Sequence, residues 1–305
     1  MSKIQTAIKQ LKSDRGEFMA SIISNFFRWL PDATYLKLLY RFKMGHRLDL
    51  KNPQTFTEKL QWLKLYNRKP EYTKMVDKYA VKEYVANIIG EEYIIPTLGV
   101  WDKHENIDWD SLPNQFVLKT THGGGGGGVV ICKDKTIFDK ASAIAKLKES
   151  MASDIYSGLR EWPYKDVPRR IIAEKFLAPE KSPAPNDLPD YKFFCFNGKV
   201  KFFKVDFGRF VEHHANYYSP EGELLEFGEQ GLEPDPNYPI ELPNNLKEMI
   251  SLAEKLSANE SFLRVDLFNV NGNIYFGELT FYPASGMLPW TTEEADMKIG
   301  KYLKL

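Results

Sequence analysis

The sequence predicts an α+β protein in which a mostly helical N-terminal region precedes two stacked α+β lobes with a cleft between them. Three observations support this class. Apolar residues recur at three- and four-residue spacing through residues 1–92, as in amphipathic helices. Short β-branched and aromatic runs follow from residue 93, and a stretch with four prolines, residues 178–189, divides them into two groups. We therefore expect three units: residues 1–92, 93–178 and 179–305.

The composition is that of a folded protein without a dominant surface charge. Of 305 residues, 43% are hydrophobic and 27% charged, which excludes a disordered chain. Lysine plus arginine equals aspartate plus glutamate at 41 each, which argues against a surface built to hold nucleic acid. Cys132 and Cys195 lie in apolar runs, and this indicates buried, reduced thiols in a cytoplasmic protein.

The N-terminal segment has no sign of a membrane span. No apolar stretch reaches the roughly 18 residues that a span needs, and residues 4–15 mix lysines with polar residues, unlike a secretory signal. Residues 18–30 are apolar and aromatic at helical spacing. We interpret them as a helix packed on the body. Contact with a membrane, and so a membrane-peripheral location, is the alternative interpretation.

Three further helices are expected in the N-terminal region, over residues 35–44, 58–66 and 77–89. Thr57 is the expected N-cap of the second, and Gly90 ends the third. The polar face of the third helix presents Lys78 and Lys82.

The strands fall into two groups. In the first lobe, strands are expected at residues 94–95, 116–121, 129–132 and 170–177, with a helix at 138–153. In the second, two strands at 191–197 and 199–207 join through Asn197-Gly198, the strongest short hairpin signal. A helix at 244–257 and a second hairpin, residues 262–270 and 274–282 around Asn271-Gly272, complete this lobe.

Six consecutive glycines lie between two strands of the first lobe. They are Gly123, Gly124, Gly125, Gly126, Gly127 and Gly128. Ordering such a run costs backbone entropy, and a glycine hairpin can lay successive N–H groups over phosphates where any Cβ would block the approach. The run precedes a strand rather than a helix and no Gly-Lys-Ser/Thr follows, so neither a Rossmann turn nor a P-loop is indicated. We interpret it as a phosphate-covering flap, with a flexible surface hairpin as the alternative.

The C-terminal hairpin carries charged residues among apolar ones. Arg264 and Asp266 share one face of its first strand, and Glu278 and Thr280 share one face of its second. A two-residue loop would pair Asp266 with Gly277 and place Glu278 on the opposite face. A three-residue loop, residues 271–273, would pair Asp266 with Glu278 and Arg264 with Thr280.

We predict the three-residue loop, because it collects the polar residues on one face and stacks Phe268 on Phe276 beneath them. Opposed Cβ atoms would then hold the carboxylates of Asp266 and Glu278 about 5 Å apart. Like charges that close are unfavourable unless a cation lies between them, and oxygen ligands suit magnesium. The alternative is an ordinary salt bridge between Asp266 and Arg264.

Two further residues lie where a nucleotide site would need them. Lys119 immediately precedes the glycine run and can reach the phosphates that the run would cover. Glu174 lies in an apolar strand just before the proline-rich stretch, where a carboxylate can accept the exocyclic amine of adenine. A carboxylate at a strand edge facing water is the alternative for Glu174.

This set of residues resembles the ATP-grasp enzymes, and most closely their teichuronopeptide-biosynthesis (TupA-like) branch. The resemblance extends over roughly residues 40–300. The stretches that carry it are residues 52–59 (Asn-Pro-Gln-Thr-Phe-Thr-Glu-Lys) with Trp62, 116–123 (Phe-Val-Leu-Lys-Thr-Thr-His-Gly), 191–198 (Tyr-Lys-Phe-Phe-Cys-Phe-Asn-Gly), 264–272 and 275–283.

The resemblance implies an ATP-grasp fold whose two α+β lobes clasp ATP and Mg²⁺. Lys82 and Lys119 would contact phosphates, with Lys119 also near the adenine, and the glycine run would close over the β- and γ-phosphates. Glu174 would hold the adenine amine. The hinge would be Lys175, Phe176 and Leu177; Asp190 would bind the ribose hydroxyls, and Lys192 lies beside it in the nucleotide site.

The resemblance also implies the catalytic and metal residues. Asp266 and Glu278 would bind magnesium, and Arg264 would steady the transferred phosphate, with Lys119 and Arg209 as further catalytic residues. Thr280 would complete the metal site with a hydroxyl, where the family pattern has the carbonyl of an asparagine. Candidates for the acceptor side are Lys204, Asp206, Arg209, His213 and His214.

The chemistry implied is ATP-dependent joining of a carboxylate to an amine through an acyl phosphate. The substrates would be a small-molecule or polysaccharide-precursor carboxylate and an amine such as an amino acid, in cell-surface polysaccharide or glycopeptide synthesis. Two alternatives remain: a glycosyltransferase of polysaccharide synthesis, although no Asp-x-Asp motif is present, and a small-molecule kinase or nucleotide-binding module, although no His-Arg-Asp-like context is present. Neither the oligomeric state nor the identity of the substrates follows from the sequence.

Overall fold

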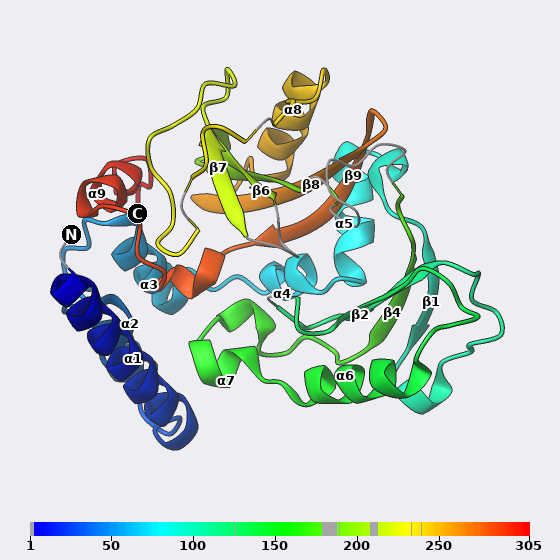
Figure 1. Cartoon of the computed structure of the whole chain (residues 1–305), viewed down its shortest axis with the longest axis horizontal. Coiled ribbons are helices and arrows are strands. Elements are labelled where there is room, and N and C mark those ends of the chain that lie inside the picture. The colour runs from blue at the N-terminus through cyan, green and yellow to red at the C-terminus, as the bar shows by residue number, and fades with distance from the viewer. Residues whose placement is uncertain are drawn as a thin grey trace.

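Two antiparallel sheets make up the body of the chain, and a pair of N-terminal helices extends from one side of it (Figure 1). The structure is a computed structural model that describes residues 3–124, 126–178, 188, 190–207, 213–232, 234–238 and 240–305. Arg209 and Gly125, two of the residues implicated by the sequence, lie outside this part of the chain.

The helices of the described residues are α1 Lys3–Phe26, α2 Asp32–Met44, α3 Phe56–Tyr66, α4 Glu71–Val76, α5 Ala80–Ile89, α6 Lys140–Ala152, α7 Ile155–Leu159, α8 Leu246–Leu256 and α9 Glu293–Gly300, with short 3₁₀ turns η1 Glu91–Tyr93, η2 His104–Asn106, η3 Trp162–Tyr164 and η4 Pro283–Gly286. None of them combines the length and the apolar character that crossing a bilayer requires. The strands are β1 Thr97–Trp101, β2 Phe116–Thr120, β3 Val129–Cys132, β4 Ile171–Lys175, β5 Asp190–Phe196, β6 Lys199–Phe207, β7 His214–Tyr218, β8 Phe262–Val270 and β9 Asn273–Thr280.

Sheet A has the strand order β1-β4-β2-β3, and sheet B has the order β7-β6-β5-β8-β9. Helix α6 covers sheet A, where Ala143 and Leu147 pack with Phe116 and Leu118. Helix α8 covers one face of sheet B (Figure 1). Helices α4 and α5 lie between the two sheets, which places their polar residues at the junction of the lobes.

Helices α3, α4 and α5 belong to the same hydrophobic core as sheet B. Phe56 of α3, Tyr72 of α4 and Val85 of α5 are buried with Phe194 and Phe262 of that sheet. Helices α1 and α2 form a separate core together with Leu48 and Met287. The division into units at residues 92 and 178 stays a prediction.

Several local predictions were wrong, two of them because a side chain has a partner that periodicity does not show. The N-cap of helix α3 is Thr55, whose hydroxyl accepts from the Glu58 N–H at 3.2 Å in a capping box; Thr57 instead donates to Asp296 at 2.5 Å. The helix predicted at 77–89 starts only at residue 80, because the carboxylate of Asp77 accepts from the Tyr79 N–H and separates α4 from α5. The first strand lies at residues 97–101 rather than 94–95.

The C-terminal hairpin has the predicted pairing but not the predicted loop. Asp266 opposes Glu278 and Arg264 opposes Thr280, as expected. The loop has two residues, since Val270 pairs with Asn273 and both Asn271 and Gly272 have positive φ. Phe268 therefore pairs with Tyr275, not with Phe276, and a β-bulge between Asp266 and Leu267 then shifts the register by one residue, so that Asp266 opposes Glu278.

Gly277 lies at this bulge. A Cβ there would be only 3.0 Å from the backbone oxygen of Asp266 and 3.1 Å from the ring of Phe268. A glycine in a strand interior often marks a bulge for this reason. The bulge, and not the loop length, brings the two carboxylates to the same face of the sheet.

Candidate active site

A pocket between the two lobes brings together residues from α5, sheet A and β9. Its lining consists of Lys78, Lys82, Ile94, Ile95, Lys119, Glu174, Phe276 and Gly277. Three lysines and one carboxylate thus converge on a concave site whose far wall is the bulged strand of sheet B. Such a collection of cations suits a polyanionic ligand.

Glu174 is the centre of the sheet A side of this pocket. Its side chain is 6% exposed, and its two oxygens pair with Lys82 at 2.6 Å and Lys119 at 2.5 Å. Burial acts to raise the pKa of Glu174, but the two lysines outweigh it and hold that pKa below the ordinary value. Burial lowers the pKa of Lys82, whose ammonium also donates to the Ile95 carbonyl at 2.6 Å. The edge-strand alternative for Glu174 is therefore wrong, because β4 lies between β1 and β2 and the carboxylate is buried.

Lys78 links the two lobes, and the sequence interpretation did not assign it to the site. Its ammonium lies 3.4 Å from an oxygen of Glu278 on β9, and its backbone N–H donates to the Thr121 carbonyl just before the glycine run. The signal that could have found it is its place four residues before Lys82. Its actual position depends on the interruption between helices α4 and α5 at Asp77, whose carboxylate pairs with Arg170 at 2.6 Å.

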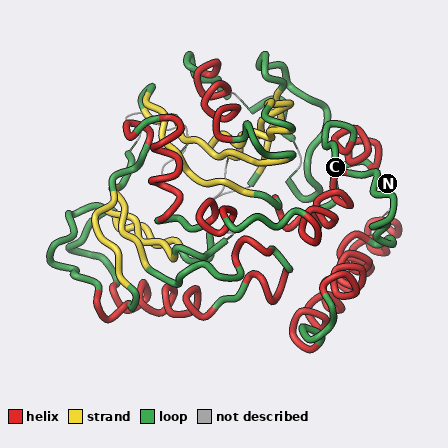
Figure 2. The backbone as a smooth tube through the Cα atoms, turned by 180° about the vertical axis from the view of Figure 1, so that it is seen from behind, coloured by secondary structure: helices red, strands yellow, loops and turns green. Residues whose placement is uncertain are grey.

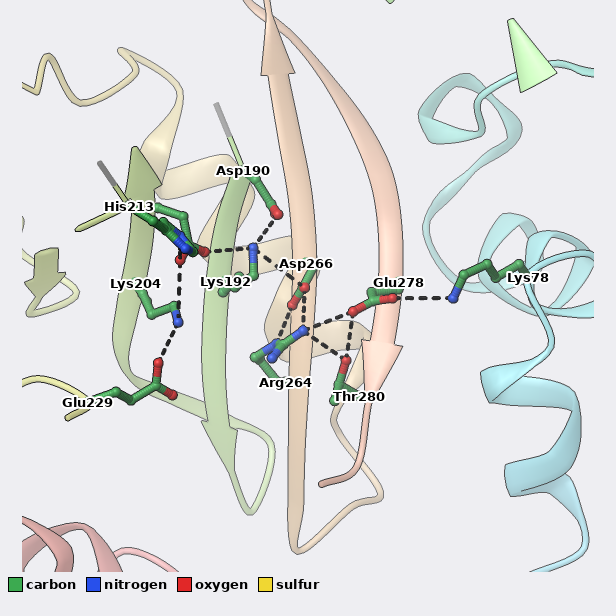
Figure 3. Close-up of polar contacts among 11 residues, drawn as sticks. Lys78, Asp190, Lys192, Lys204, His213, Glu229, Arg264, Asp266, Glu278 and Thr280 are labelled. Carbon is green, nitrogen blue, oxygen red and sulfur yellow. Dashed lines mark hydrogen bonds and ion pairs between the residues drawn. The ribbon is translucent and has the colours of Figure 1, made fainter. Parts of the chain in front are cut away.

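Charged residues on one face of sheet B lie in a single row across four strands (Figure 3). Lys204 opposes Lys192, which opposes Asp266, which opposes Glu278. Arg264 lies in the next row, opposite Thr280. Because facing residues share a side of the sheet, β5, β6, β8 and β9 all present their polar groups to the same space.

Arg264 holds the two predicted metal carboxylates together. Its guanidinium makes two bonds to Asp266, at 2.7 and 2.6 Å, and one to Glu278 at 2.9 Å. It also donates to the Thr280 hydroxyl at 3.0 Å, and that hydroxyl donates to Glu278 at 3.1 Å. The salt bridge between Asp266 and Arg264, given above as the alternative, is present in this state.

The two carboxylates differ in their electrostatic surroundings. Burial raises the pKa of Asp266 to about 7 against the opposing effect of Arg264 and Lys192. Burial also acts to raise the pKa of Glu278, but Lys78 and Arg264 bring it down to about 2. Asp266 is therefore the carboxylate that depends more on a nearby cation to stay ionised.

These residues suit magnesium only if a ligand supplies further oxygens. In the part of the chain that the structure describes, no three His, Cys, Asp or Glu side chains are grouped to hold a metal ion. Two carboxylates and a hydroxyl are hard oxygen donors, and magnesium commonly takes one or two carboxylates together with substrate phosphates and water. The donor set fits that mode, provided that the Arg264 guanidinium moves from between the carboxylates.

A second polar cluster continues from Asp266 toward β6 and β7. Lys192 pairs with Asp190 and lies 2.9 Å from Asp206. Lys204 bonds Glu229 at 2.6 Å, and Asp206 lies 3.0 Å from His213. These groups are nearly all buried and form one connected network (Figure 3). The structure thus joins Asp190, Lys192 and most of the acceptor-side candidates, while the ring of His214 stacks on Phe207 instead.

The glycine run has packed ends and an open tip. A Cβ at Gly123 would collide with the Thr120 hydroxyl, and one at Gly128 would collide with both Thr120 and Ser150, which bond each other at 2.6 Å. Gly126 has positive φ, and neither it nor Gly127 would bring a Cβ into contact with anything. Bulk is excluded at the base of the run, at Gly123 and Gly128, whereas a Cβ at Gly126 or Gly127 would meet open space.

A buried lysine that the sequence did not indicate, Lys64, holds the turn that follows β9. The turn η4 that follows β9 has three consecutive left-handed residues, Ala284, Ser285 and Gly286. Lys64 of α3 is fully buried and donates to the Ser285 carbonyl at 2.8 Å, the Ser285 hydroxyl at 2.7 Å and the Leu159 carbonyl at 3.0 Å. Burial lowers the pKa of Lys64 to about 8, with Glu161 as the opposing charge.

A family model described as TupA-like ATPgrasp matches residues 58–304. Among solved structures, a D-alanine–D-alanine ligase from Bacillus anthracis complexed with ATP is 18% identical, with a TM-score of 0.38 over 68% of this chain and 53% of that one. D-alanyl-alanine synthetase A from Vibrio cholerae is 15% identical, with a TM-score of 0.45 over 77% and 65%. The ATP-grasp ligase PsnB, complexed with minimal precursor, Mg and ADP, is 12% identical, with a TM-score of 0.39 over 86% and 64%.

The chain spans about half the length of the first solved structures that it matches. No curated protein matches it.

Proposed function

Because the chain belongs to the TupA-like ATP-grasp family, we propose that it is an ATP-dependent ligase that joins a carboxylate to an amine through an acyl phosphate. The observation that carries the proposal is the junction of the lobes. There Lys78, Lys82 and Lys119 line one pocket together with Phe276 and Gly277 of β9. Lys78 also lies 3.4 Å from Glu278, the strand partner of Asp266, and Lys119 lies shortly before the glycine run.

In this proposal the sheet A side of the pocket binds the nucleotide. Lys82 and Lys119 exchange Glu174 for phosphate oxygens, and Glu174 is released to accept the adenine amine. Lys78 contributes a third cation for the phosphates. The hinge of Lys175, Phe176 and Leu177 lines the adenine site. Glycines 123–128 supply backbone N–H groups over the phosphates, and Asp190 and Lys192 lie on the ribose side.

The sheet B side holds the reacting groups. Asp266, Glu278 and the Thr280 hydroxyl would hold Mg²⁺, which neutralises phosphate charge when bound. Arg264, displaced from the carboxylates, then steadies the phosphoryl group in transit. The acceptor carboxylate takes the γ-phosphoryl group and releases ADP. The amine next attacks the acyl carbon, loses a proton and expels phosphate. The protein's part is to position reactants and neutralise charge.

We further propose that the carboxylate belongs to a cell-surface polysaccharide or glycopeptide precursor and that the amine is an amino acid. The resemblance to the teichuronopeptide-biosynthesis branch supports this choice. Lys204, Asp206 and His213, together with Arg209, form the proposed acceptor side, because Lys192 connects Asp206 to Asp266.

The test measures ADP and phosphate release with ATP and magnesium while uronic acids and amino acids are scanned as substrate pairs. Hydroxylamine in place of the amine traps an acyl phosphate as a hydroxamate. We expect substrate-dependent ADP release that is lost in Glu278→Gln and kept in the control Glu254→Gln, whose carboxylate pairs with Lys199 on the surface. Consumption of a nucleotide sugar without ADP would favour a transferase. ADP formation with a stable phosphorylated product and no need for an amine would favour a kinase.

A further inference from the structure

The outer side of α1 and the turn after it expose an unusual number of aromatic side chains. Phe18 is 65% exposed, Phe26 72%, Trp29 76% and Phe27 37%. Phe18 and Phe26 are eight residues apart, which places both on one side of the helix, and the other two follow within three residues. We call these four residues the aromatic edge.

The aromatic edge is not the face with which the helix folds. Ala20 and Ile23 on the inner side of α1 are buried against Tyr35, Leu36 and Leu39 of α2. Helices α1 and α2 form a hairpin that extends beyond the body of the protein (Figures 1 and 2). The inner side therefore satisfies the packing needs of α1, and the aromatic edge is surplus to folding.

The turn that carries Phe27 and Trp29 is tied firmly to the body. Arg160 is 4% exposed, and its guanidinium donates to the Arg28 carbonyl at 2.5 Å and pairs with Asp32 at 3.0 Å. The hydroxyl of Tyr35 donates to the Gly158 carbonyl at 2.7 Å. The aromatic side chains are thus presented from an anchored backbone.

The charge of the chain divides at the same place. Residues 1–50 contain nine lysines and arginines against four aspartates and glutamates, a net charge of +5. Because the whole chain has 41 of each kind, the remaining residues carry a net charge of −5. The overall neutrality noted above hides a basic helical hairpin attached to an acidic body.

We propose that the aromatic edge is a membrane-docking surface that inserts at the interface of a bilayer containing anionic lipid. Exposed Trp and Phe on a basic amphipathic helix are the combination that binds in the headgroup region. Lysines and arginines add attraction to anionic headgroups, which salt weakens. The acidic body is repelled from the same surface, so the hairpin alone faces the bilayer. This surface is separate from the proposed catalytic site.

The experiment is co-sedimentation of the full chain with phosphatidylcholine vesicles, with and without phosphatidylserine. We expect at least about tenfold stronger binding to the serine-containing vesicles, reduced by added salt. The double variant Phe26→Ser/Trp29→Ser should lose about tenfold in binding, because its two apolar side chains no longer insert. Ile137→Ser is the matched control, since Ile137 is 83% exposed on α6's side of the molecule, and it should bind as the unaltered chain does.

Size-exclusion chromatography and urea unfolding of both variants complete the test. All three side chains are exposed, so the variants should be as stable as the unaltered chain. The proposal is overturned if the unaltered chain does not bind anionic vesicles, or if Phe26→Ser/Trp29→Ser binds them equally well. It is also overturned if the unaltered chain is a dimer that the double variant turns into a monomer, because the aromatic edge would then be covered by a second copy.

Discussion

Replacing Glu174 with glutamine tests the buried charge cluster at the centre of the proposed nucleotide site. The substitution keeps the shape of the side chain but removes the charge shared by Lys82 and Lys119, whose side chains are only 13% and 18% exposed. Removing one partner of a buried ion pair costs about 3–5 kcal/mol. Lys82 keeps its bond to the Ile95 carbonyl and both lysines retain some access to water, so we expect the lower limit, about 3 kcal/mol.

The loss should depend on pH with a definite sign. The folded-state pKa of Glu174 lies below its ordinary value of 4.5, because Lys119 and Lys82 outweigh burial. The ionised carboxylate therefore contributes stability that is complete above pH 4.5 and is lost as the pH falls through the folded-state pKa. The difference in unfolding free energy between the unaltered chain and Glu174→Gln should be full at pH 7 and shrink below pH 4.5.

Urea unfolding followed by tryptophan fluorescence measures this difference. Glu254→Gln is the control, because its partner Lys199 is 67% exposed and surface pairs contribute only about 0–1 kcal/mol. A Glu174→Gln protein within about 1 kcal/mol of the unaltered chain at pH 7 would refute the reasoning. So would a loss of stability that does not change with pH.

Two further substitutions test the support of the site. Lys64→Met should lower the unfolding free energy by about 3–5 kcal/mol, because Ser285 and Leu159 lose their hydrogen-bond donor and Glu161 loses its counter-charge. The control is Lys69→Met, at a half-exposed lysine, which should lower the unfolding free energy far less in the same urea titration. Equal stabilities of the two variants would contradict the role given to Lys64. Gly128→Ala should overpack against Thr120 and Ser150, lower the unfolding free energy by about 1–3 kcal/mol and so lower the thermal midpoint. In Gly127→Ala the new methyl group meets open space, and the thermal midpoint should stay nearly unchanged. The reverse order of the two midpoints would show that the base of the run is not packed as described.

The C-terminal hairpin shows how far local sequence signals reach. Asn271-Gly272 correctly indicated the turn, and alternation along the two strands correctly indicated which polar residues share a face. The predicted loop length was wrong, yet the predicted pairing was right. A two-residue loop followed by a bulge at Gly277 gives the same pairing of Asp266 with Glu278 as a three-residue loop without a bulge. A glycine inside a strand is a recognised bulge signal, so this register was in principle readable from the sequence.

Local signals were enough to predict the α+β class, the two hairpins of sheet B and most of the residues proposed for the site, because periodicity, turn chemistry and motif spacing act over a few neighbouring residues. Tertiary structure decided the partners. Lys78 reaches Glu278 across 200 positions and Lys64 reaches Ser285 across 221. A buried charge must find an opposite charge or a set of acceptors wherever the fold places one, since leaving it unpaired costs more than local propensity can supply. That requirement also placed Arg264 between the two carboxylates: the spacing along β8 indicated its salt bridge with Asp266, but not its further bond to Glu278.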